Sequence, residues 1–408
     1  MNKFFFFISF LFLLTFTPIF GALDRATIQW FLLSVFSFVF ISLKIKTEYL
    51  KNFNFLIYLF FLFQIFLSLI YTNNLSISLV DLSRHITVFV LITICISLLN
   101  TNTFSFYKLS IIVSIALLFE SIFSLSPVFY YIYNNGFNFS LIDSVDINVL
   151  KGITGNRNIT TASLVIKFPF LFYLFLKSKI SFKPFILFLA LFPSLSLFLI
   201  NSRAALLSFS IFLLFIPFYF LFYKRDKIIQ AIYFYSPIVF AYIFSLIILP
   251  SKSSNAIQNL SSIKFTSESS NYRFELWANA LDFISNNLFI GCGIGNWKVE
   301  SAFYWGSIGS DYLVPYHAHN DFLEFSSEIG IIGGLTYLFL FVFVLYNFFN
   351  LFFVSKDLKF FILFFSFFAL LIDSSLNFPF ERPIIQVMFV LLISLSIYFN
   401  HIHNEKEL

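Results

Sequence analysis

The sequence has few charged residues and almost no cysteine. Only 11% of its 408 residues are charged, whereas 59% are hydrophobic, and the mean hydropathy is +0.90. These values exclude a soluble globular protein and predict a polytopic membrane protein. The two cysteines, Cys95 in an apolar run and Cys292 in a polar loop, can form neither a disulfide framework nor a metal site.

Apolar runs long enough to span a bilayer as helices recur along the chain, which predicts an all-α membrane protein. The first run also has the form of a signal peptide, but the bulky Phe20 disfavours cleavage after Ala22. We predict a membrane bundle over 1–250, a polar loop over 251–328 and a second membrane bundle over 329–408. There are twelve predicted spans: 4–20, 27–43, 53–70, 82–99, 109–125, 160–177, 183–200, 204–222, 231–250, 329–353, 359–372 and 383–400.

Lysines lie on alternate connections between these spans. The positive-inside rule makes those connections, and both termini, cytoplasmic. The two long connections, 126–159 and 251–328, then lie on the opposite, external face of the membrane. The cytoplasmic cations are Lys44, Lys46, Lys51, Lys108, Lys177, Lys179, Lys183, Lys224, Arg225, Lys227, Lys356 and Lys359.

Arginines show the opposite distribution, because six of seven fall at or beyond the outer boundary. A guanidinium offers a fork of donors that matches phosphate oxygens in pairs, so this cluster indicates a phosphorylated or carboxylated ligand. Lipid headgroups, or ion pairs with Asp24, Asp81, Asp373 and Glu381, are the alternative. The outer arginines are Arg25, Arg84, Arg157, Arg203, Arg273 and Arg382.

Two ionisable residues, Glu120 and Lys167, lie inside predicted spans. Neither can face lipid cheaply, so we predict a mutual ion pair inside the bundle, or a polar cavity that both line. The turn-rich segment 152–158 precedes the sixth span, with Thr160 or Thr161 as the expected helix cap. Its Asn156 and Asn158 could place amide donors near an external site.

The long loop contains a serine-rich linker from Ser251 to Ser270 and then an expected amphipathic helix. Apolar residues recur at helical spacing at Phe274, Trp277, Leu281 and Ile284, with Arg273 at the start. Three glycines at 291, 293 and 295 predict a tight turn that returns the chain toward the bundle. A nucleotide-binding loop is disfavoured because no βαβ unit can surround it.

The segment 315–334 concentrates polar chemistry just before a span. His317 and His319 lie two residues apart, and Asp321 with Glu324 has the form of a capping box, which predicts a helix that begins after His319. Partial positive charge at a helix N-terminus favours a neutral imidazole and attracts anions. The segment therefore suits a general base or a phosphate-binding group.

Several motifs together resemble the O-antigen ligase and O-antigen polymerase superfamily of bacterial envelope glycosyltransferases. His319-Asn320, followed by Gly330 and Gly333, is similar to the ligase signature of that family. The resemblance also covers Gly155-Asn156-Arg157-Asn158, Asn201-Ser202-Arg203-Ala204-Ala205, Arg273 with Trp277 and the glycine turn, and Asn377-Phe378-Pro379. The family has proline where this chain has Arg157, so the role of that residue stays open.

The resemblance implies a fold similar to GT-C type glycosyltransferases and an inverting, metal-independent transfer at the periplasmic face. The implied donor is a glycan on undecaprenyl diphosphate, and the acceptor is a hydroxyl of the lipid A core in lipopolysaccharide biosynthesis. A polymerase would use a second lipid-linked repeat as acceptor, and related enzymes use proteins. A flippase or transporter for a lipid-linked glycan is the alternative from another class, disfavoured because paired halves with interrupted helices are not evident.

Site residues follow from matching this chemistry to the chain. Arg203, Arg273 and Arg84 are the predicted diphosphate ligands, since two phosphates must be neutralised and no Asp-x-Asp pair lies on the outer face. His319 is the predicted base, oriented by Asn320 or Glu324. His317 is the other candidate base. Two further roles for His319 stay open: binding of phosphate without proton transfer, or a hydrogen bond to a loop carbonyl. Trp277, Asn156 and Asn158 are possible further contacts.

Overall fold

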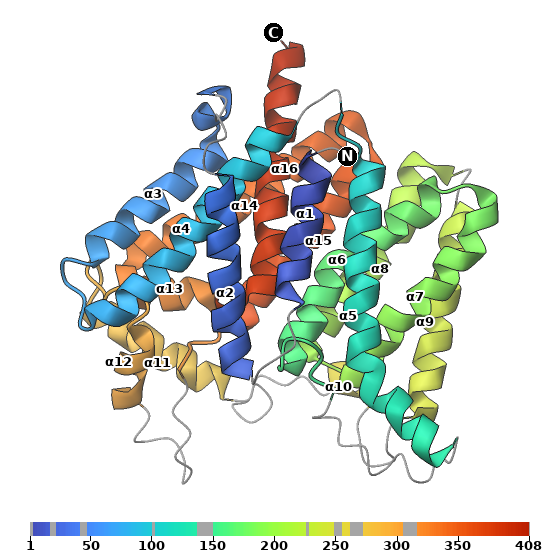
Figure 1. Cartoon of the computed structure of the whole chain (residues 1–408), viewed down its shortest axis with the longest axis horizontal. Coiled ribbons are helices and arrows are strands. Elements are labelled where there is room, and N and C mark those ends of the chain that lie inside the picture. The colour runs from blue at the N-terminus through green and yellow to red at the C-terminus, as the bar shows by residue number, and fades with distance from the viewer. Residues whose placement is uncertain are drawn as a thin grey trace. The chain divides into compact units, whose positions relative to one another are not determined.

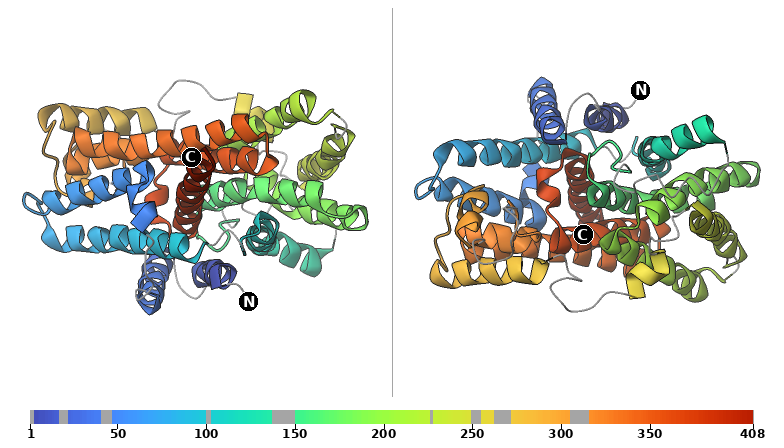
Figure 2. Two further views of the ribbon diagram at one scale, coloured as in Figure 1. Left: turned by 90° about the horizontal axis from the view of Figure 1, so that it is seen from above. Right: turned by 90° about the horizontal axis from the view of Figure 1, so that it is seen from below.

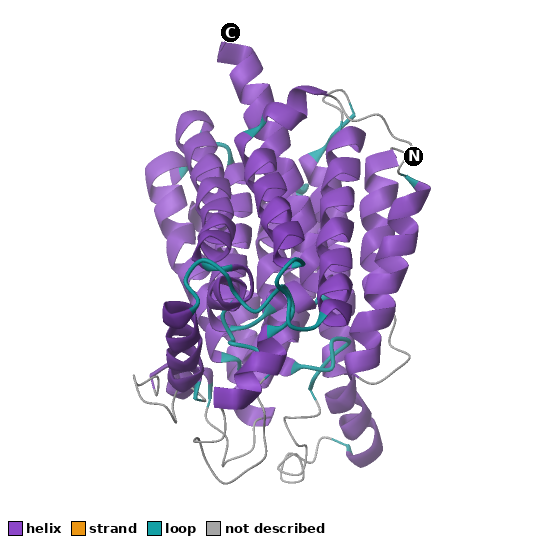
Figure 3. Ribbon diagram, turned by 90° about the vertical axis from the view of Figure 1, so that its left-hand side faces the viewer, coloured by secondary structure: helices purple, strands orange, loops and turns teal. Residues whose placement is uncertain are grey.

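The chain folds into helices only, over the part that the structure describes. This computed structural model describes residues 3–16, 22–40, 47–99, 103–136, 150–225, 228–248, 255–261, 272–304 and 316–407. No strand is present among these residues (Figure 3). Of the predicted serine-rich linker, Ser251 to Ser270, the structure describes only 255–261. Four other residues named above also lie outside the described part: Lys44, Lys46, Lys227 and Pro315.

Nine of the described helices are long and apolar enough to cross a membrane. The three shorter apolar helices, Lys3–Thr15, Ala26–Val39 and Phe53–Ser68, coincide with the first three predicted spans. Each predicted span therefore overlaps a helix, and the prediction of an all-α polytopic membrane protein is confirmed. The nine are α4 (Leu75–Leu98), α5 (Phe106–Asn135), α6 (Arg157–Lys177), α7 (Lys183–Ile200) with the preceding η4 (Ile180–Phe182), α8 (Arg203–Tyr223), α9 (Ile228–Ile248), α14 (Ile331–Ser355), α15 (Leu358–Leu376) and α16 (Pro383–Glu407).

The described residues form two compact units, each assembled from separate stretches of sequence (Figure 1). Unit 1 comprises Met1–Gln29, Asn102–Ser262 and Phe352–Leu370, and unit 2 comprises Trp30–Thr101, Ile263–Leu351 and Leu371–Leu408. The division at residues 250 and 328 stays a prediction. The remaining helices are α1 (Lys3–Thr15), α2 (Ala22–Val39), η1 (Thr47–Lys51), α3 (Phe53–Ser68), α10 (Ala256–Ser261), α11 (Arg273–Asn286), α12 (Trp297–Tyr304), α13 (Asp321–Ile329) and η7 (Pro379–Glu381).

Unit 1 contains the ion pair expected between α5 and α6. Lys167 Nζ lies 2.8 Å from Glu120 Oε2, and both side chains are fully buried. Ser163 completes the group, because its hydroxyl lies 3.1 Å from the same carboxylate oxygen and also contacts the lysine. The prediction of a mutual pair is confirmed. A carboxylate and an ammonium that satisfy each other can be buried inside a bundle, whereas either alone would be costly.

Unit 2 is built around α16, which packs against α4 (Figure 2). The hydroxyl of Ser394 on α16 donates to the carbonyl of Ile92 on α4, 3.5 Å away. Phe325 of α13 packs between Tyr337 of α14 and Phe61 of α3, with ring centroids 4.7 and 5.2 Å apart. These contacts fix the short helix α13 against the longer helices of the unit.

Asparagine side chains begin several of these helices. Asn74, Asn156 and Asn320 each accept backbone N–H groups of the first turn of α4, α6 and α13. The expectation of a Thr160 or Thr161 cap for α6 is wrong, because α6 begins four residues earlier, at Arg157. An asparagine oxygen satisfies N–H groups that otherwise lack a partner at a helix start.

Candidate functional site

The loop before α13 is held by the side chain of Asn320. Its Oδ1 accepts the backbone N–H groups of Phe322 and Leu323, at 3.0 and 3.1 Å. The predicted capping box of Asp321 and Glu324 is wrong by one position, since Asn320 is the cap and Asp321 is the first helical residue. Glu324 is then one residue too far along the helix to return to the cap. The predicted helix start itself is correct.

Glu324 instead joins α13 to His317. Its Oε1 lies 2.8 Å from His317 Nδ1, and its Oε2 accepts the backbone N–H of Ala318 at 2.9 Å. The imidazole of His317 also stacks on Phe378, with ring centroids 4.2 Å apart. Burial lowers the pKa of His317, but Glu324 and Glu381 raise it by more, so its pKa lies above the usual value. His317 is therefore an oriented imidazole with a carboxylate partner.

His319 has a different environment two residues away. Its backbone lies in the left-handed region, with φ of 52°, which is uncommon for residues other than glycine. Its ring meets Phe378 edge-on at 5.0 Å, and no described residue bonds to its buried Nδ1. Burial, followed by the nearby positive charges of Arg273 and His317, lowers the pKa of His319 to about 3. His319 is thus neutral near pH 7.

Arg273 reaches the same region from the first residue of α11. Its Nη2 donates to Asn377 Oδ1 at 3.0 Å, and Asn377 Nδ2 donates to Asp373 Oδ1 at 2.5 Å. Asn377 directly precedes Phe378, the ring that both imidazoles contact. The structure therefore brings His317 and His319 into contact with Phe378, and it places Arg273 against the adjacent residue, Asn377.

Arg84 is held by two carboxylates. Its Nη1 lies 2.7 Å from Asp81 Oδ1 and 2.8 Å from Glu381 Oε2, and its side chain is 13% exposed. Lys298 Nζ lies 3.5 Å from the other oxygen of Asp81. Burial raises the pKa of Glu381, but Arg84 leads a group of cations that lower it by more. The sequence left open whether the outer arginines bind a ligand or form ion pairs with nearby carboxylates. Arg84 forms ion pairs, with Asp81 and Glu381.

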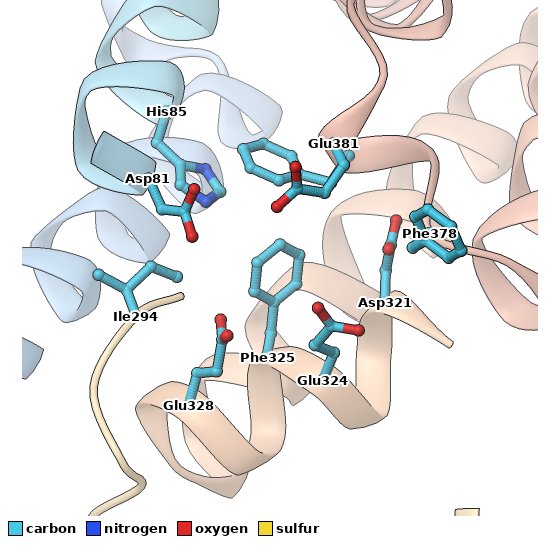
Figure 4. Close-up of a pocket in the computed structure, with 10 residues that line it drawn as sticks. Asp81, His85, Ile294, Asp321, Glu324, Phe325, Glu328, Phe378 and Glu381 are labelled. Carbon is cyan, nitrogen blue, oxygen red and sulfur yellow. The ribbon is translucent and has the colours of Figure 1, made fainter. Parts of the chain in front are cut away.

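Five carboxyl groups line a pocket between α4, α13 and η7 (Figure 4). The carboxyl groups of Asp81, Glu328 and Glu381 point toward one space, with His85 beside them (Figure 4). Burial raises the pKa of Glu328, and its neighbours Glu324 and Asp81 raise it further. Burial likewise raises the pKa of Asp321. Among the described residues, no group of histidine, cysteine, aspartate and glutamate side chains is arranged to hold a metal ion.

The glycine turn packs the loop onto α13, as predicted. Cys292 N–H donates to the carbonyl of Ser327 at 3.0 Å, and Gly293 N–H donates to that of Glu328 at 2.8 Å. Gly295 has φ of 75°, and an added Cβ would collide with the carboxylate of Asp81. The turn thus brings backbone directly against the acidic pocket.

The buried face of α11 differs from the expected one. Leu276, Ala280, Phe283 and Ile284 are buried, whereas Leu281 is 53% exposed. The face changes because Ala280 and Phe283 pack in a cluster with Cys292, Trp297 and Ala318, residues that the turn and the histidine loop supply. Trp277 lies on α11 with its ring edge-on to Phe274 at 5.6 Å. Because Ala318 lies between His317 and His319, the cluster connects the histidine loop to α11, the helix that begins with Arg273.

Three predicted residues belong to unit 1. Arg203 Nε donates to Asn259 Oδ1 at 2.8 Å, and Asn259 Nδ2 donates to the carbonyl of Asn201 at 2.8 Å. Asn156 Oδ1 accepts the backbone N–H groups of Asn158 and Ile159. Asn156 therefore has a capping role, and Asn158 lies in the first turn of α6. The side chain of Arg25 lies outside the described part.

Phe378, Glu381 and Arg382 were missed as site residues by reasoning from sequence. Arg382 lies over the Phe378 ring, 5.0 Å from its centroid, and Glu381 is bound to Arg84. Asp81, Asp321, Glu328 and Lys298 were missed as well. Two signals pointed to this segment: the Asn377-Phe378-Pro379 motif, and the place of Arg382 among the outer arginines.

The helices define a multi-pass, all-α membrane protein. Residues 185–338 match the model of the family described as O-antigen ligase. The matched range includes Arg203, Arg273, His319 and the glycines at 330 and 333. This match supports the resemblance to the O-antigen ligase and polymerase superfamily over residues 185–338. No curated protein matches the sequence.

Proposed function

We propose that the protein is an O-antigen ligase-like glycosyltransferase of the bacterial inner membrane. It moves a glycan from undecaprenyl diphosphate to a hydroxyl of the lipid A core at the periplasmic face, with inversion and without a metal. The observation that carries the proposal is the proximity of Arg273 to His319, two residues inside the range that matches the family. Both termini are cytoplasmic in this arrangement.

Arg273 is the proposed principal ligand of the donor diphosphate. Its position at the start of α11 adds the partial positive charge of a helix N-terminus to its own. A guanidinium can meet two phosphate oxygens at once, which stabilises the charge that develops on the leaving group. Arg203 belongs to unit 1, and its role as a diphosphate ligand stays a prediction from the sequence. Arg84, bound to Asp81 and Glu381, is better described as a positioning residue for Glu381, whose charge helps to raise the pKa of His317.

His319 is the proposed general base. In the transfer, the acceptor oxygen bonds to the anomeric carbon, the bond from that carbon to the diphosphate breaks, and the hydroxyl proton passes to the imidazole. Arg273 is one cause of the low pKa of His319, after burial. A bound diphosphate would offset the charge of Arg273, so donor binding would raise the pKa of His319 and strengthen it as a base.

His317 is the alternative base, and a specific observation supports it. Its Nδ1 lies 2.8 Å from Glu324, so a carboxylate orients the ring and stabilises its protonated form. This is the arrangement in which a histidine commonly accepts a proton at its other nitrogen. The two histidines differ in how their pKa values depend on Glu324, which allows them to be told apart.

The surface polysaccharide of a deletion strain tests the proposal. A bare lipid A core with free lipid-linked polymer supports a ligase, and restoration by the wild-type gene but not by Arg273→Ala or His319→Ala supports the site. A core that bears a single repeat would make the protein a polymerase. Accumulation of the lipid-linked glycan inside the cell would identify a flippase and contradict the proposed enzyme.

A further inference from the structure

A second polar cavity lies in unit 1, at one end of three long helices. It has a volume of about 290 Å³ and is lined by the ends of α6 and α8 and by the turn between α14 and α15. Three lysines line it: Lys177 is the last residue of α6, Lys224 follows α8, and Lys356 follows α14. All three side chains are exposed.

Aromatic side chains fix the walls of this cavity. Tyr219 packs against Phe361 and Phe352, with ring centroids 5.1 and 5.9 Å apart. Lys356 has a left-handed backbone, with φ of 52°, and its Nζ lies 5.8 Å from the ring centroid of Tyr223. A left-handed residue directly after a helix is a common way to end it, and the Lys356 N–H bonds to the carbonyl of Phe352. The end of α14 therefore directs the Lys356 ammonium toward Tyr223, the last residue of α8.

The cavity has an excess of positive charge. No carboxylate of the described residues lies within ion-pair distance of Lys177, Lys224 or Lys356. The acidic lining residue, Asp357, lies 3.1 Å from Lys359 and is neutralised there. Three ammonium groups around one hollow repel one another, so an anion that enters it would be stabilised.

The cavity also lies at the level of lipid headgroups. The helices that end there, α6, α8 and α14, have 21, 21 and 25 residues and are each long enough to cross the bilayer. Residues directly after such spans lie at the membrane surface, where clustered lysines bind anionic lipids. By the lysine distribution this is the cytoplasmic surface.

We propose that this lysine cavity binds a phosphate group, supplied by the headgroup of an anionic phospholipid. The volume is close to the lower end for small-molecule pockets, roughly 300 Å³, and accommodates a glycerophosphate headgroup. The acyl chains of such a lipid would lie along the apolar surfaces of the helices. The lipid would stabilise the junction of α6, α8 and the α14–α15 turn.

Thermal unfolding of the purified full-length protein in detergent tests this assignment. Cardiolipin should raise the Tm of the wild type, and phosphatidylcholine should not. The triple variant Lys177→Gln/Lys224→Gln/Lys356→Gln should bind cardiolipin roughly a hundredfold more weakly, about fivefold for each lysine. The corresponding triple arginine variant should keep the response, which separates lost charge from damaged folding.

A matched triple variant removes the same charge elsewhere. Lys51→Gln/Lys108→Gln/Lys179→Gln changes three exposed lysines and should respond to cardiolipin like the wild type. Equal loss in this control, or a normal response in the cavity variant, would overturn the assignment. The Tm of the wild type is also measured with inorganic phosphate in place of cardiolipin, at matched ionic strength. Protection by phosphate as strong as by cardiolipin would keep the phosphate site but contradict a lipid as its source.

Discussion

Two histidines separated by a single residue have opposite electrostatic surroundings. His317 contacts the carboxylate of Glu324, whereas His319 lies close to the cation Arg273. The same aromatic ring, Phe378, contacts both imidazoles. The pKa of His317 is therefore raised and that of His319 lowered, so the pair offers one group that holds a proton and one that is neutral.

The pH profile of transfer by Glu324→Gln distinguishes the two candidate bases. Without the carboxylate, burial is the leading influence on His317, and its pKa falls. A base must be deprotonated, so activity that depends on His317 rises with pH through its raised pKa, and the variant would shift this rise to lower pH. With His319 as base we expect no shift to lower pH, because Glu324 acts on His319 only through the charge of His317, and loss of that charge would raise the pKa of His319.

Rates from pH 5 to 9 measure this outcome. Asp282→Asn changes an exposed carboxylate of the same loop and is the matched control. If Glu324→Gln moves the acid side of the profile to lower pH and Asp282→Asn does not, His317 and not His319 is the base.

Short helices and turns decide where these side chains lie. The helix α13 has only nine residues, and its first turn depends on the Asn320 cap and on packing against α11. The sequence predicted where α13 begins, because polar residues precede an apolar run there. It could not identify the cap, since Asp321 and Asn320 are both suitable by type and only Asp321 becomes buried in the acidic pocket.

Substitution of the cap gives a prediction at this scale. Asn320→Ala should destabilise the first turn of α13 by about 1 kcal/mol, whereas Asn320→Ser should retain most of the stability. Hydrogen exchange of the Phe322 and Leu323 amides measures the change, with roughly fivefold less protection expected in the alanine variant. Unchanged protection in Asn320→Ala would show that the side chain does not serve as the cap.

At the scale of the whole molecule, the sequence predicted the spans much better than the site. Apolar runs and buried charges such as Glu120 and Lys167 report directly on helices and their packing. The contact between Arg84 and Glu381 joins residues 297 positions apart, and neither the apolar pattern nor local spacing specifies it. The role of Phe378 as the ring between two histidines likewise depends on the fold.

The predicted orientation of the chain can be measured with reporter fusions. A fusion after Lys227 should report the cytoplasm, and one near Ser261 should report the periplasm, because a single span, α9, separates them. Fusions that report the same side would remove α9 as a crossing helix. Reversed sides would place the arginines and His319 in the cytoplasm and contradict a periplasmic transfer.

The most direct measurement of the central claim is glycan transfer by purified protein in lipid vesicles. The substrates are a glycan on undecaprenyl diphosphate and a lipid A core acceptor. We predict transfer by the wild type, a loss of about a hundredfold or more in Arg273→Ala and in His319→Ala, and poor rescue by Arg273→Lys. The exposed arginine variant Arg225→Ala should be unaffected. Wild-type rates in both Arg273→Ala and His319→Ala would contradict this account.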